Sequence, residues 1–413
     1  MIKDCQKIKS NILNLIILFY LFTFMFYYIA PVEIRKIYYL AGYLTVLAAL
    51  PAGRSLVTWK ENRDIAGAIA LFGLTLLGWY GLTHTHSEYW AIYDSYKDTG
   101  KVMLVTALII FLVSNLRFSF PATLFSLLLI AAGLVINLYA VYQGMALESM
   151  RLEINFDRAT VIAYIFTMTN IVMLGAILEL KSRYRYFIFL FAALSGFAAI
   201  TYTETRAALL AFPVLIVLLL IVHPRIHKAQ LIRLGMAFII MLILLAAAFH
   251  QKLTDRYQEL RHDVSLYQDN NSVSSIGARL VMLRTGLQAG LDAPFGESAE
   301  RRGDDIKRQV QANPGLAGVL DFITVHMHNE LIENFSLRGI AGVTTLILLY
   351  ITLLINAWRK RNVIQGILIL SVIVYGLSDV VFFSKEATIV FSTALILSIL
   401  HQKIVIKQDR DYE

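Results

Sequence analysis

The sequence predicts an all-α polytopic membrane protein with about 12 transmembrane helices and one large loop outside the membrane. Of its 413 residues, 58% are hydrophobic and only 16% are charged. Roughly a quarter of the residues in a soluble globular protein are charged. The mean hydropathy is +0.64, which is more apolar surface than a soluble core absorbs. This composition excludes a soluble enzyme, a disordered chain and a nucleic-acid-binding protein.

Twelve apolar stretches have the length of a membrane-spanning helix. A bilayer core about 30 Å thick requires about 20 consecutive apolar residues in a helix. The first stretch is expected to be a permanent helix, because it is too long for a signal peptide and lacks a small-residue cleavage site. The stretches are residues 11–30, 38–53, 65–83, 102–116, 122–145, 159–180, 186–203, 207–223, 231–249, 339–356, 363–383 and 387–406.

The distribution of Lys and Arg between the connections predicts the orientation of these helices. The short connections on one side hold 19 Lys or Arg residues, and those on the other side hold 8. Because Lys and Arg accumulate in cytoplasmic loops, the richer side is expected to be cytoplasmic, together with both termini. The net charge of +8 is therefore mostly a signal of topology and requires no nucleic-acid partner.

One polar connection is much longer than the others and divides the chain into three parts. Residues 1–249 hold the first nine predicted helices, residues 250–338 form the long connection, and residues 339–413 hold the last three helices and a cytoplasmic tail. Such a long loop in an economical bundle is usually functional or disordered. Its many apolar residues favour order, so we expect an outward-facing loop with amphipathic helices and the active-site motifs.

Within this loop, residues 274–288 have the pattern of an amphipathic helix. The apolar residues recur at spacings of 4, 3 and 4 and form one stripe: Ile276, Leu280, Leu283 and Leu287. Arg279 and Arg284 fall on opposite flanks of that stripe. Such a helix is expected to lie at the membrane interface, in contact with membrane lipids and with its arginines at headgroup level.

Several enzyme classes lack their motifs in this sequence. It contains no Walker-type loop for ATP hydrolysis, no His-Glu-x-x-His zinc peptidase motif and no Gly-x-Ser-x-Gly hydrolase motif. Two pairs of histidines stand two residues apart: His84 with His86, and His326 with His328. That spacing suits a metal only on an extended strand. Without a cysteine or a third histidine nearby, we predict no metal site.

Three outward-facing segments carry candidate functional residues. Arg206 lies in a short turn between the seventh and eighth predicted helices, where the alternative is an arginine reaching for lipid headgroups. Arg279 lies on the amphipathic helix, where the alternative is an ordinary interfacial arginine. His328 is expected in the first turn of a helix, where the helix dipole disfavours imidazolium and keeps the ring neutral. The alternative for His328 is a residue that only caps the helix.

Two arginines and a histidine on one side of the membrane form a candidate diphosphate site. Guanidinium groups bind phosphate oxygens bidentately and neutralise the charge that builds up on a departing diphosphate. A membrane enzyme without a nucleotide-binding loop can use a substrate that is already activated on a lipid. These features indicate a sugar donor linked to a polyprenyl diphosphate.

The order and spacing of the motifs resemble those of bacterial O-antigen ligases over nearly the whole chain. The motifs are Thr205-Arg206-Ala, Ser275-x-Gly-Ala-Arg279-Leu, His328-Asn-x9-Gly339-x-x-Gly342 and Gly376-Leu-Ser-Asp379. The His-Asn-x9-Gly-x-x-Gly motif is shared with O-antigen polymerases and O-linked protein oligosaccharyltransferases. By itself, that motif therefore identifies only the superfamily.

The resemblance implies a glycosyltransferase of lipopolysaccharide biosynthesis. Such an enzyme moves O-antigen polysaccharide from undecaprenyl diphosphate onto a terminal sugar of lipid A–core, with inversion and without a metal or other cofactor. The resemblance also implies a multispan fold similar to the lipid-donor (GT-C-like) glycosyltransferases, in the bacterial inner membrane with the active site facing the periplasm.

The resemblance also implies roles for individual residues. Arg206 and Arg279 would bind the donor diphosphate, and His328 would be the catalytic residue. Asp379 matches a family aspartate near the outer end of a predicted helix, where an ionisable residue is a functional candidate. The other candidate supporting residues are Asn329, Glu330, His326 and Arg284.

Two other functions remain as alternatives. A polymerase of the same superfamily would join repeat units on the lipid carrier. A flippase or transporter is the non-enzymatic alternative, because twelve helices with inward and outward loops suit one. Against transport, few ionisable residues lie within the predicted helices, and the polar candidates gather at the outer face.

Overall fold

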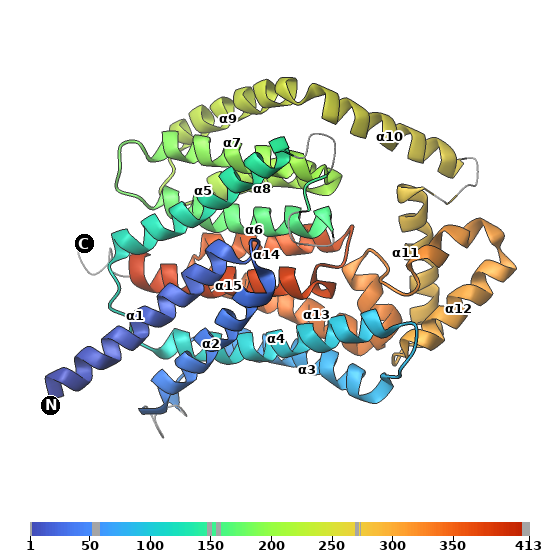
Figure 1. The fold of residues 1–413 in the computed structure, drawn as a ribbon, viewed down its shortest axis with the longest axis horizontal. Helices are drawn as coiled ribbons and strands as arrows, with labels where there is room; N and C mark the ends of the chain where they lie inside the picture. Colours follow the sequence, from blue (N-terminus) through green and yellow to red (C-terminus); the bar gives the residue numbers. More distant parts are fainter. Residues whose placement is uncertain are drawn as a thin grey trace.

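The computed structural model describes residues 2–51, 58–146, 151–153, 158–268, 272 and 274–406. Within these ranges the chain forms helices and connecting turns and no β-strand, which confirms the all-α prediction. Figure 1 shows an elongated bundle in which most of the helices run along the longest axis of the molecule.

Each of the twelve predicted stretches overlaps a helix, but the eleventh, residues 363–383, runs past the end of its helix at Gly376 into the segment that holds Asp379. Residues 52–53 of the second stretch lie outside the described residues. The twelve helices are α1 (Ile2–Phe26), α2 (Pro31–Ala49), α3 (Arg63–Thr83), α4 (Trp90–Asn115), α5 (Ala122–Ala146), α6 (Ala159–Leu178), α7 (Arg185–Thr203), α8 (Arg206–Val222), α9 (Lys228–Ala248), α13 (Glu330–Lys360), α14 (Val363–Gly376) and α15 (Lys385–His401). In the described part of the chain, eight helices are long and apolar enough to cross a membrane: α3 to α7, α9, α13 and α15. The protein is therefore a multi-pass helical membrane protein.

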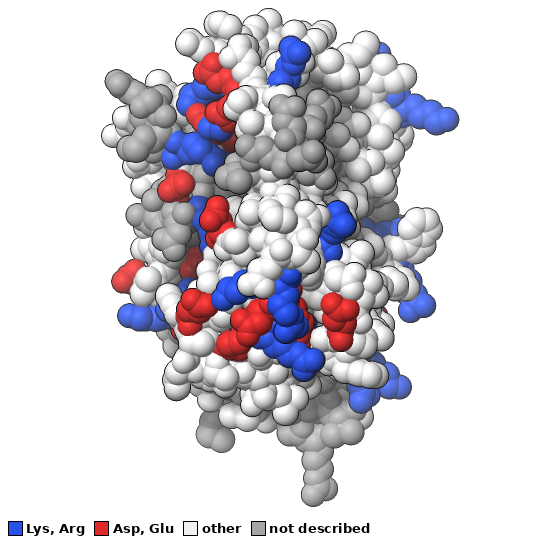
Figure 2. Space-filling view, turned by 90° about the vertical axis from the view of Figure 1, so that its right-hand side faces the viewer, with Lys and Arg blue, Asp and Glu red and all other residues white. Residues whose placement is uncertain are grey.

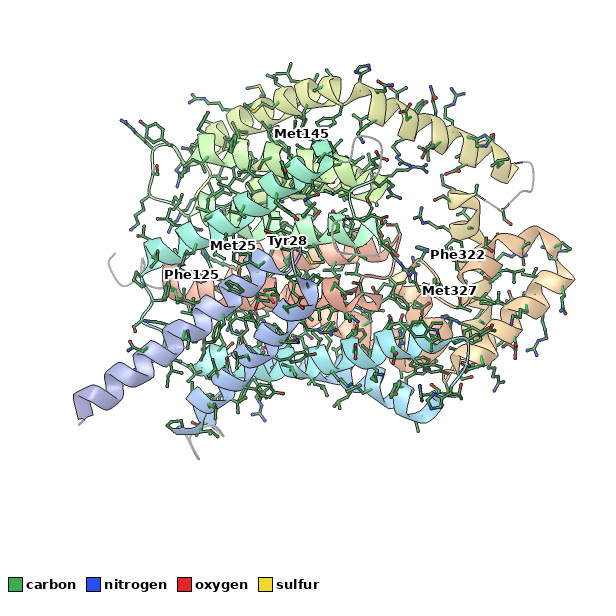
Figure 3. All side chains as sticks on the ribbon, in the orientation of Figure 1. Met25, Tyr28, Phe125, Met145, Phe322 and Met327 are labelled. Carbon is green, nitrogen blue, oxygen red and sulfur yellow. The ribbon has the colours of Figure 1, made fainter. Side chains whose placement is uncertain are left out.

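Helices α6 and α15 lie at the centre of the bundle, and α9 lies at its periphery. In the most apolar window of each helix, 94% of α6 and 89% of α15 are buried, against 11% of α9. Side chains fill the space between the helices (Figure 3). At the turn after α1, for example, the ring of Tyr28 lies 6.0 Å from that of Tyr139 on α5. A helix that is apolar on every side suits the centre, whereas α9 leaves its apolar side chains free to contact lipid.

The long connection is ordered into helices at one end of the bundle. It contains α10 (His250–Gln268), α11 (Ser275–Asp292), α12 (Ala299–Ala312) and the 3-10 helix η2 (Pro314–Phe322). α10 follows α9 directly, and α11 runs across the ends of the bundle helices (Figure 1). Helix α1 begins and α15 ends at the opposite end of the molecule. The connection and the two ends of the described chain are therefore on opposite sides.

Helix α11 confirms the predicted amphipathic helix, but its apolar stripe is not the face that packs. Leu280, Leu283 and Leu287 are 42–43% exposed. The packed face is rich in glycine and alanine, and two of its glycines allow α13 to come close. A Cβ on Gly286 would lie 2.6 Å from Ile332, and one on Gly290 would lie 2.3 Å from Phe335. The leucine stripe is thus left free, as contact with the membrane interface requires.

Acidic and basic side chains are intermingled at this end of the molecule. Figure 2 views it face-on and shows blue and red residues side by side rather than in separate regions. Residues 250–327 hold nine Lys or Arg and ten Asp or Glu, so this segment is close to neutral. The described part of this face therefore carries positive and negative charges side by side rather than one extended basic surface.

Helix α13 contains a sharp break at Gly339, where the tenth predicted stretch begins. The backbone of Gly339 has φ of 58° and ψ of −149°. The chain on either side of the break is bonded to the connection between α11 and α12. The N–H of Ile340 donates to the carbonyl of Pro294 at 2.9 Å, and the N–H of Glu297 donates to the carbonyl of Leu337 at 2.9 Å. Gly339 therefore joins the bundle part of α13 to the part that carries the candidate site.

Candidate active site

The start of α13 positions the His328 motif. The side chain of Asn329 accepts the N–H groups of Leu331 and Ile332, each at 3.1 Å, and so caps the helix. His328 lies just before this cap, with a left-handed backbone at φ of 46°. The prediction that His328 lies in the first helical turn is therefore wrong. The short Asn side chain is the better N-cap, so the helix begins after it.

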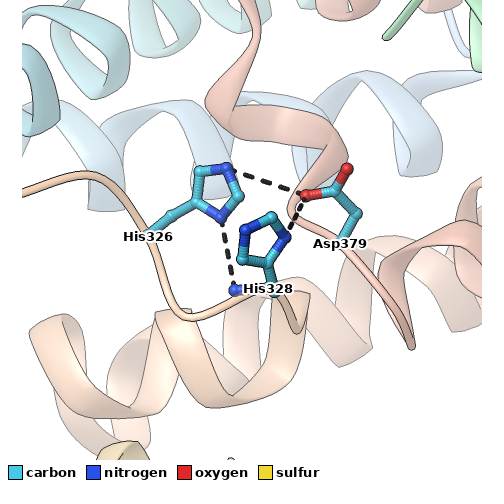
Figure 4. Close-up of side chains that lie close together, drawn as sticks. All are labelled: His326, His328 and Asp379. Carbon is cyan, nitrogen blue, oxygen red and sulfur yellow. Dashed lines mark hydrogen bonds and ion pairs between the residues drawn. The ribbon is translucent and has the colours of Figure 1, made fainter. Parts of the chain in front are cut away.

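His328 contacts Asp379, which lies between α14 and the short 3-10 helix η3 (Val381–Phe383). Nδ1 of His328 is 3.1 Å from Oδ1 of Asp379, and Nε2 of His326 is 3.7 Å from the same oxygen (Figure 4). The contact between Nδ1 of His328 and Asp379 does not have the alignment of a hydrogen bond, because of the orientation of the His328 ring. Two histidines and one carboxylate therefore share one small site, which we call the His–Asp cluster.

Asn329 and Glu330 hold the two halves of this cluster together. The Asn329 amide donates to the carbonyl of Leu377 at 3.0 Å. The buried Glu330 carboxylate accepts the N–H of Phe382 at 3.1 Å. Leu377 and Phe382 flank Asp379 in the sequence, so both bonds tie the start of α13 to the segment that carries the aspartate. Asn329 and Glu330 thus join the two segments that carry the His–Asp cluster.

Burial and neighbouring groups set the charges in the cluster. Burial alone raises the pKa of the Asp379 carboxyl, but its contacts with His328 and His326 outweigh burial and hold that pKa well below its usual range. The carboxylate also accepts the hydroxyl of Tyr164 at 3.0 Å and the N–H of Val380 at 2.9 Å. Burial lowers the pKa of His326 well below its ordinary value, although Asp379 acts in the opposite direction. At neutral pH, Asp379 is ionised and His326 is neutral.

Arg206 and Arg279 line the same pocket, as the sequence analysis expected of a shared site. This pocket, which we call the arginine pocket, has a volume of about 360 Å³ and lies between the starts of α8 and α11 and one face of α10. Tyr164 and Ser378 also line it. Because Tyr164 donates to Asp379, its side chain connects the pocket wall with the His–Asp cluster.

The two arginines differ in what they already bind. Arg206 donates to Asp263 at 2.9 Å and to Glu259 at 3.0 Å, both on α10. Arg279 donates to the hydroxyl of Ser275 at 3.1 Å, and its buried Nε has no hydrogen-bond partner. An anion that enters the pocket can therefore bind Arg279 directly, but it must replace carboxylates at Arg206.

Arg284 is not part of the arginine pocket. Its side chain is exposed and lines a separate hollow of about 200 Å³ with Ser272, Asn313 and Leu316. Arg284 follows Arg279 by five residues, which turns its side chain about 140° around α11 from that of Arg279, as the predicted positions on opposite flanks of the stripe imply. The structure therefore brings together all of the predicted site residues except this one.

The structure also shows residues at the site that the sequence analysis missed. Arg158, the N-cap residue of α6, lies with Nη1 2.8 Å from Nε2 of His326. Tyr164 binds Asp379, and Glu333 accepts the N–H of Met327, between the two histidines, at 2.8 Å. Tyr164 is indistinguishable by pattern from its apolar neighbours in a continuous apolar stretch. Arg158 directly precedes that stretch, and this position at a helix start was the only sequence feature that could have marked it as a site residue.

The His–Asp cluster supplies the third potential metal ligand that the sequence analysis did not find. His326, His328 and Asp379 each offer one possible ligand atom, and these three atoms lie within 4.8 Å of one another. However, the guanidinium of Arg158 is in contact with Nε2 of His326. Guanidinium carries a full positive charge and only donors, so it repels a divalent cation at that nitrogen. The arrangement fits a histidine–carboxylate pair in close contact better than a metal centre.

We therefore expect the activity of the purified protein to survive an excess of chelator. The family resemblance implies that Arg206 and Arg279 take the charge-neutralising role that a divalent cation has in metal-dependent glycosyltransferases. The measurement is the rate of glycan transfer with and without EDTA in metal-free buffer. Loss of transfer on chelation, with recovery after addition of Mg²⁺ or Mn²⁺, would contradict this expectation.

Comparison with known proteins agrees with the motifs. The family model described as O-Antigen ligase matches residues 188–347, which include Arg206, Arg279 and His328. The chain is 32% identical over 369 residues to the O-antigen ligase of Escherichia coli (strain K12), with 88% of this chain and 87% of that protein covered. It is 28% identical over 171 residues to an uncharacterised protein of Haemophilus influenzae, with 39% and 42% covered. This chain therefore belongs to the O-antigen ligase family.

Proposed function

We propose that this protein transfers O-antigen polysaccharide from undecaprenyl diphosphate onto a terminal sugar of lipid A–core in lipopolysaccharide biosynthesis. Membership of the O-antigen ligase family supports the reaction class. The observation that supports the chemistry is the contact between the His–Asp cluster and the arginine pocket through Tyr164. This contact supports the proposal, because it would bring a proton acceptor next to a site for a charged leaving group.

The proposed reaction is a single displacement at the anomeric carbon of the donor. The oxygen of an acceptor hydroxyl forms a bond to that carbon, and the bond from the carbon to the diphosphate oxygen breaks. The electron pair of the broken bond stays on the diphosphate, and the hydroxyl proton moves to Nε2 of His328. Attack opposite the leaving group inverts the anomeric centre, and no covalent enzyme intermediate is required.

Asp379 would orient His328 and stabilise its protonated form. Its ionised carboxylate faces Nδ1 of His328 at 3.1 Å. With the ring proton on Nδ1, the lone pair of Nε2 is available to the acceptor hydroxyl. Once His328 has taken up the proton, the adjacent negative charge favours the imidazolium. Asp379 is therefore a positioning residue rather than the base.

Arg206 and Arg279 would bind the diphosphate of the donor. Arg279 lines the pocket and has a buried Nε without a partner. At Arg206 the phosphate oxygens would replace the carboxylates of Asp263 and Glu259, with similar bidentate geometry. Both arginines would then neutralise the charge that develops on the leaving group.

We further propose a periplasm-facing site in the bacterial inner membrane. Twelve membrane-spanning helices in a GT-C-like arrangement would place residues 1–249 and 339–406 in and around the bilayer and residues 250–338 in the periplasm. The 19 to 8 distribution of Lys and Arg supports this orientation, with both termini in the cytoplasm. The placement of α11 and α12 opposite the start of α1 is consistent with it (Figure 1).

A thiol-labelling experiment tests the orientation. A cysteine introduced at Ala312, which is exposed at the end of α12, should react with an impermeant thiol reagent added from outside the inner membrane. The native Cys5, on the predicted cytoplasmic side, should not react in the same cells. Reaction at Cys5 without reaction at residue 312 would reverse the topology and the placement of the site.

Deletion of the protein, followed by analysis of surface and carrier-linked glycan, tests the proposed function against its alternatives. Loss of a ligase leaves bare lipid A–core on the surface and full-length polymer on undecaprenyl diphosphate. Loss of a polymerase leaves core that carries a single repeat unit. Loss of a flippase traps repeat units on the cytoplasmic side. We expect the first of these results.

A further inference from the structure

Two hydrogen-bond donors contact the ring of His326, although the neutral ring can accept only one hydrogen bond. The backbone N–H of His328 lies 3.2 Å from Nδ1, and Nη1 of Arg158 lies 2.8 Å from Nε2. A neutral imidazole carries a proton on one nitrogen and a lone pair on the other, so it accepts only one of these two bonds. His326 is buried and held neutral. One of the two donors therefore needs another acceptor.

Of the two donors, the Arg158 side chain is the one that can move to another acceptor. The backbone N–H of His328 is fixed, because it lies between the constrained left-handed conformation of that residue and the cap of α13. Arg158 has a long side chain that is only partly buried, and its guanidinium lies over the ring of Phe383, with 5.7 Å between the guanidinium carbon and the ring centroid. It can turn away from His326 while it stays next to the cluster.

The charge of Arg158 is also uncompensated by any carboxylate at ion-pair distance among the residues that the structure describes. Arg206, in contrast, is bound by two carboxylates of α10. Asp379 lies close by, but among the described residues its carboxylate makes its ion-pair contacts with the two histidines and not with Arg158. A full positive charge beside the reacting residues, paired only with a neutral imidazole, favours an anionic ligand over water.

We propose that Arg158 is a third donor-binding arginine, which leaves His326 and binds a phosphate oxygen of the lipid-linked diphosphate next to the bond that breaks. This inference rests on the proposed function. Arg158 would take up part of the charge that the diphosphate gains when the bond to the anomeric carbon breaks. Its departure from His326 would also remove the competition between the two donors, so binding of the donor substrate would relieve a mismatch in the free enzyme.

The test compares variants of the full-length purified protein, with inorganic diphosphate as a competitive inhibitor of transfer from the lipid-linked donor. In Arg158→Gln, the KM for the donor and the Ki for diphosphate should both rise about 10- to 100-fold, the effect of losing a hydrogen bond to a charged group. Arg158→Lys should recover part of this loss, because it keeps the charge without the fork. The matched control is Arg301→Gln on α12, whose side chain is 70% exposed. Its KM and Ki should equal those of the wild type.

Two results would overturn the inference, and they are distinguishable. If wild type and Arg158→Gln are inhibited equally, while kcat falls and the pH profile shifts, Arg158 only supports His326. If the wild-type protein neither uses the lipid-linked donor nor is inhibited by diphosphate, the proposed function fails and the inference fails with it. Arg158→Lys and size-exclusion profiles of all variants separate a loss of binding from a loss of fold.

Discussion

Replacing His328 with alanine is expected to reduce turnover by about 10²–10⁴-fold, the usual contribution of a general base. The acceptor hydroxyl is a poor nucleophile until its proton is removed, and His328, whose Nδ1 lies 3.1 Å from Oδ1 of Asp379, is the proposed base. The KM for the lipid-linked donor should change much less, because His328 is not among the residues lining the arginine pocket. Steady-state kinetics with purified donor and acceptor give both quantities.

The arginine variants provide the contrast for this prediction. Arg206→Ala and Arg279→Ala should weaken donor binding as well as turnover, because both residues line the pocket. Arg279→Lys should remain well below wild type, since lysine keeps the charge but loses the bidentate fork. If His328→Ala instead lost donor affinity in proportion to rate, His328 would be a diphosphate ligand. The base would then be sought at Asp379 or Glu330, or the reaction would proceed without a protein base.

The pH–rate profile gives a second readout of the same role. A base is active only when it is deprotonated, so the base role proposed for His328 requires wild-type activity to fall on acidification. Asp379 does not produce this loss in the mildly acidic range, because its pKa is held well below its usual value. His326 does not produce it either, because burial lowers its pKa as well. The acidic limb should therefore disappear from the residual activity of His328→Ala, and its persistence would exclude His328 as the base.

The helices could be predicted from the sequence because a membrane span is a local property. A continuous apolar run of sufficient length can satisfy its backbone only as a helix, whatever packs against it. The start of α13 was placed incorrectly, because both His328 and Asn329 can begin a helix and only the hydrogen bonds of Asn329 decide between them. The error was small in sequence, but it removed the helix-dipole argument for a neutral His328.

The contacts of the site could not be predicted in the same way. The pairing of His328 with Asp379 depends on how α13 packs against the end of α14, and no local pattern encodes it. Asp379 was identified only through the family resemblance. In the sequence, Arg158 is one of the basic residues counted for topology. A lone arginine at a helix boundary looks the same whether it only marks topology or belongs to a site. The closeness of Asp379 to both histidines could not be predicted either, because residues 326–328 and 379 meet only through the packing of distant segments.

The second large effect is expected at Gly339, where Gly339→Ala should destabilise the protein by about 3–5 kcal/mol, the sum of backbone strain and overpacking. Its backbone lies at φ of 58° and ψ of −149°, a region that residues with a side chain rarely occupy. A Cβ there would lie 2.1 Å from the carbonyl oxygen of Pro294. That carbonyl cannot withdraw freely, because it accepts the N–H of Ile340 at 2.9 Å. The measurement is the apparent melting temperature of the detergent-purified protein.

Gly78→Ala is the matched control for this substitution, because Gly78 lies within α3 and a Cβ added there would meet no neighbouring element within 4 Å. It should be neutral or stabilising by up to about 1 kcal/mol, since alanine is the better helix former. Gly339→Ala should also lose transfer activity, because the break connects the bundle to the segment that carries Asn329 and Glu330. Equal melting temperatures for Gly339→Ala and the wild type would show that α13 does not approach Pro294 this closely. The two-glycine spacing of the motif would then need a reason other than backbone geometry.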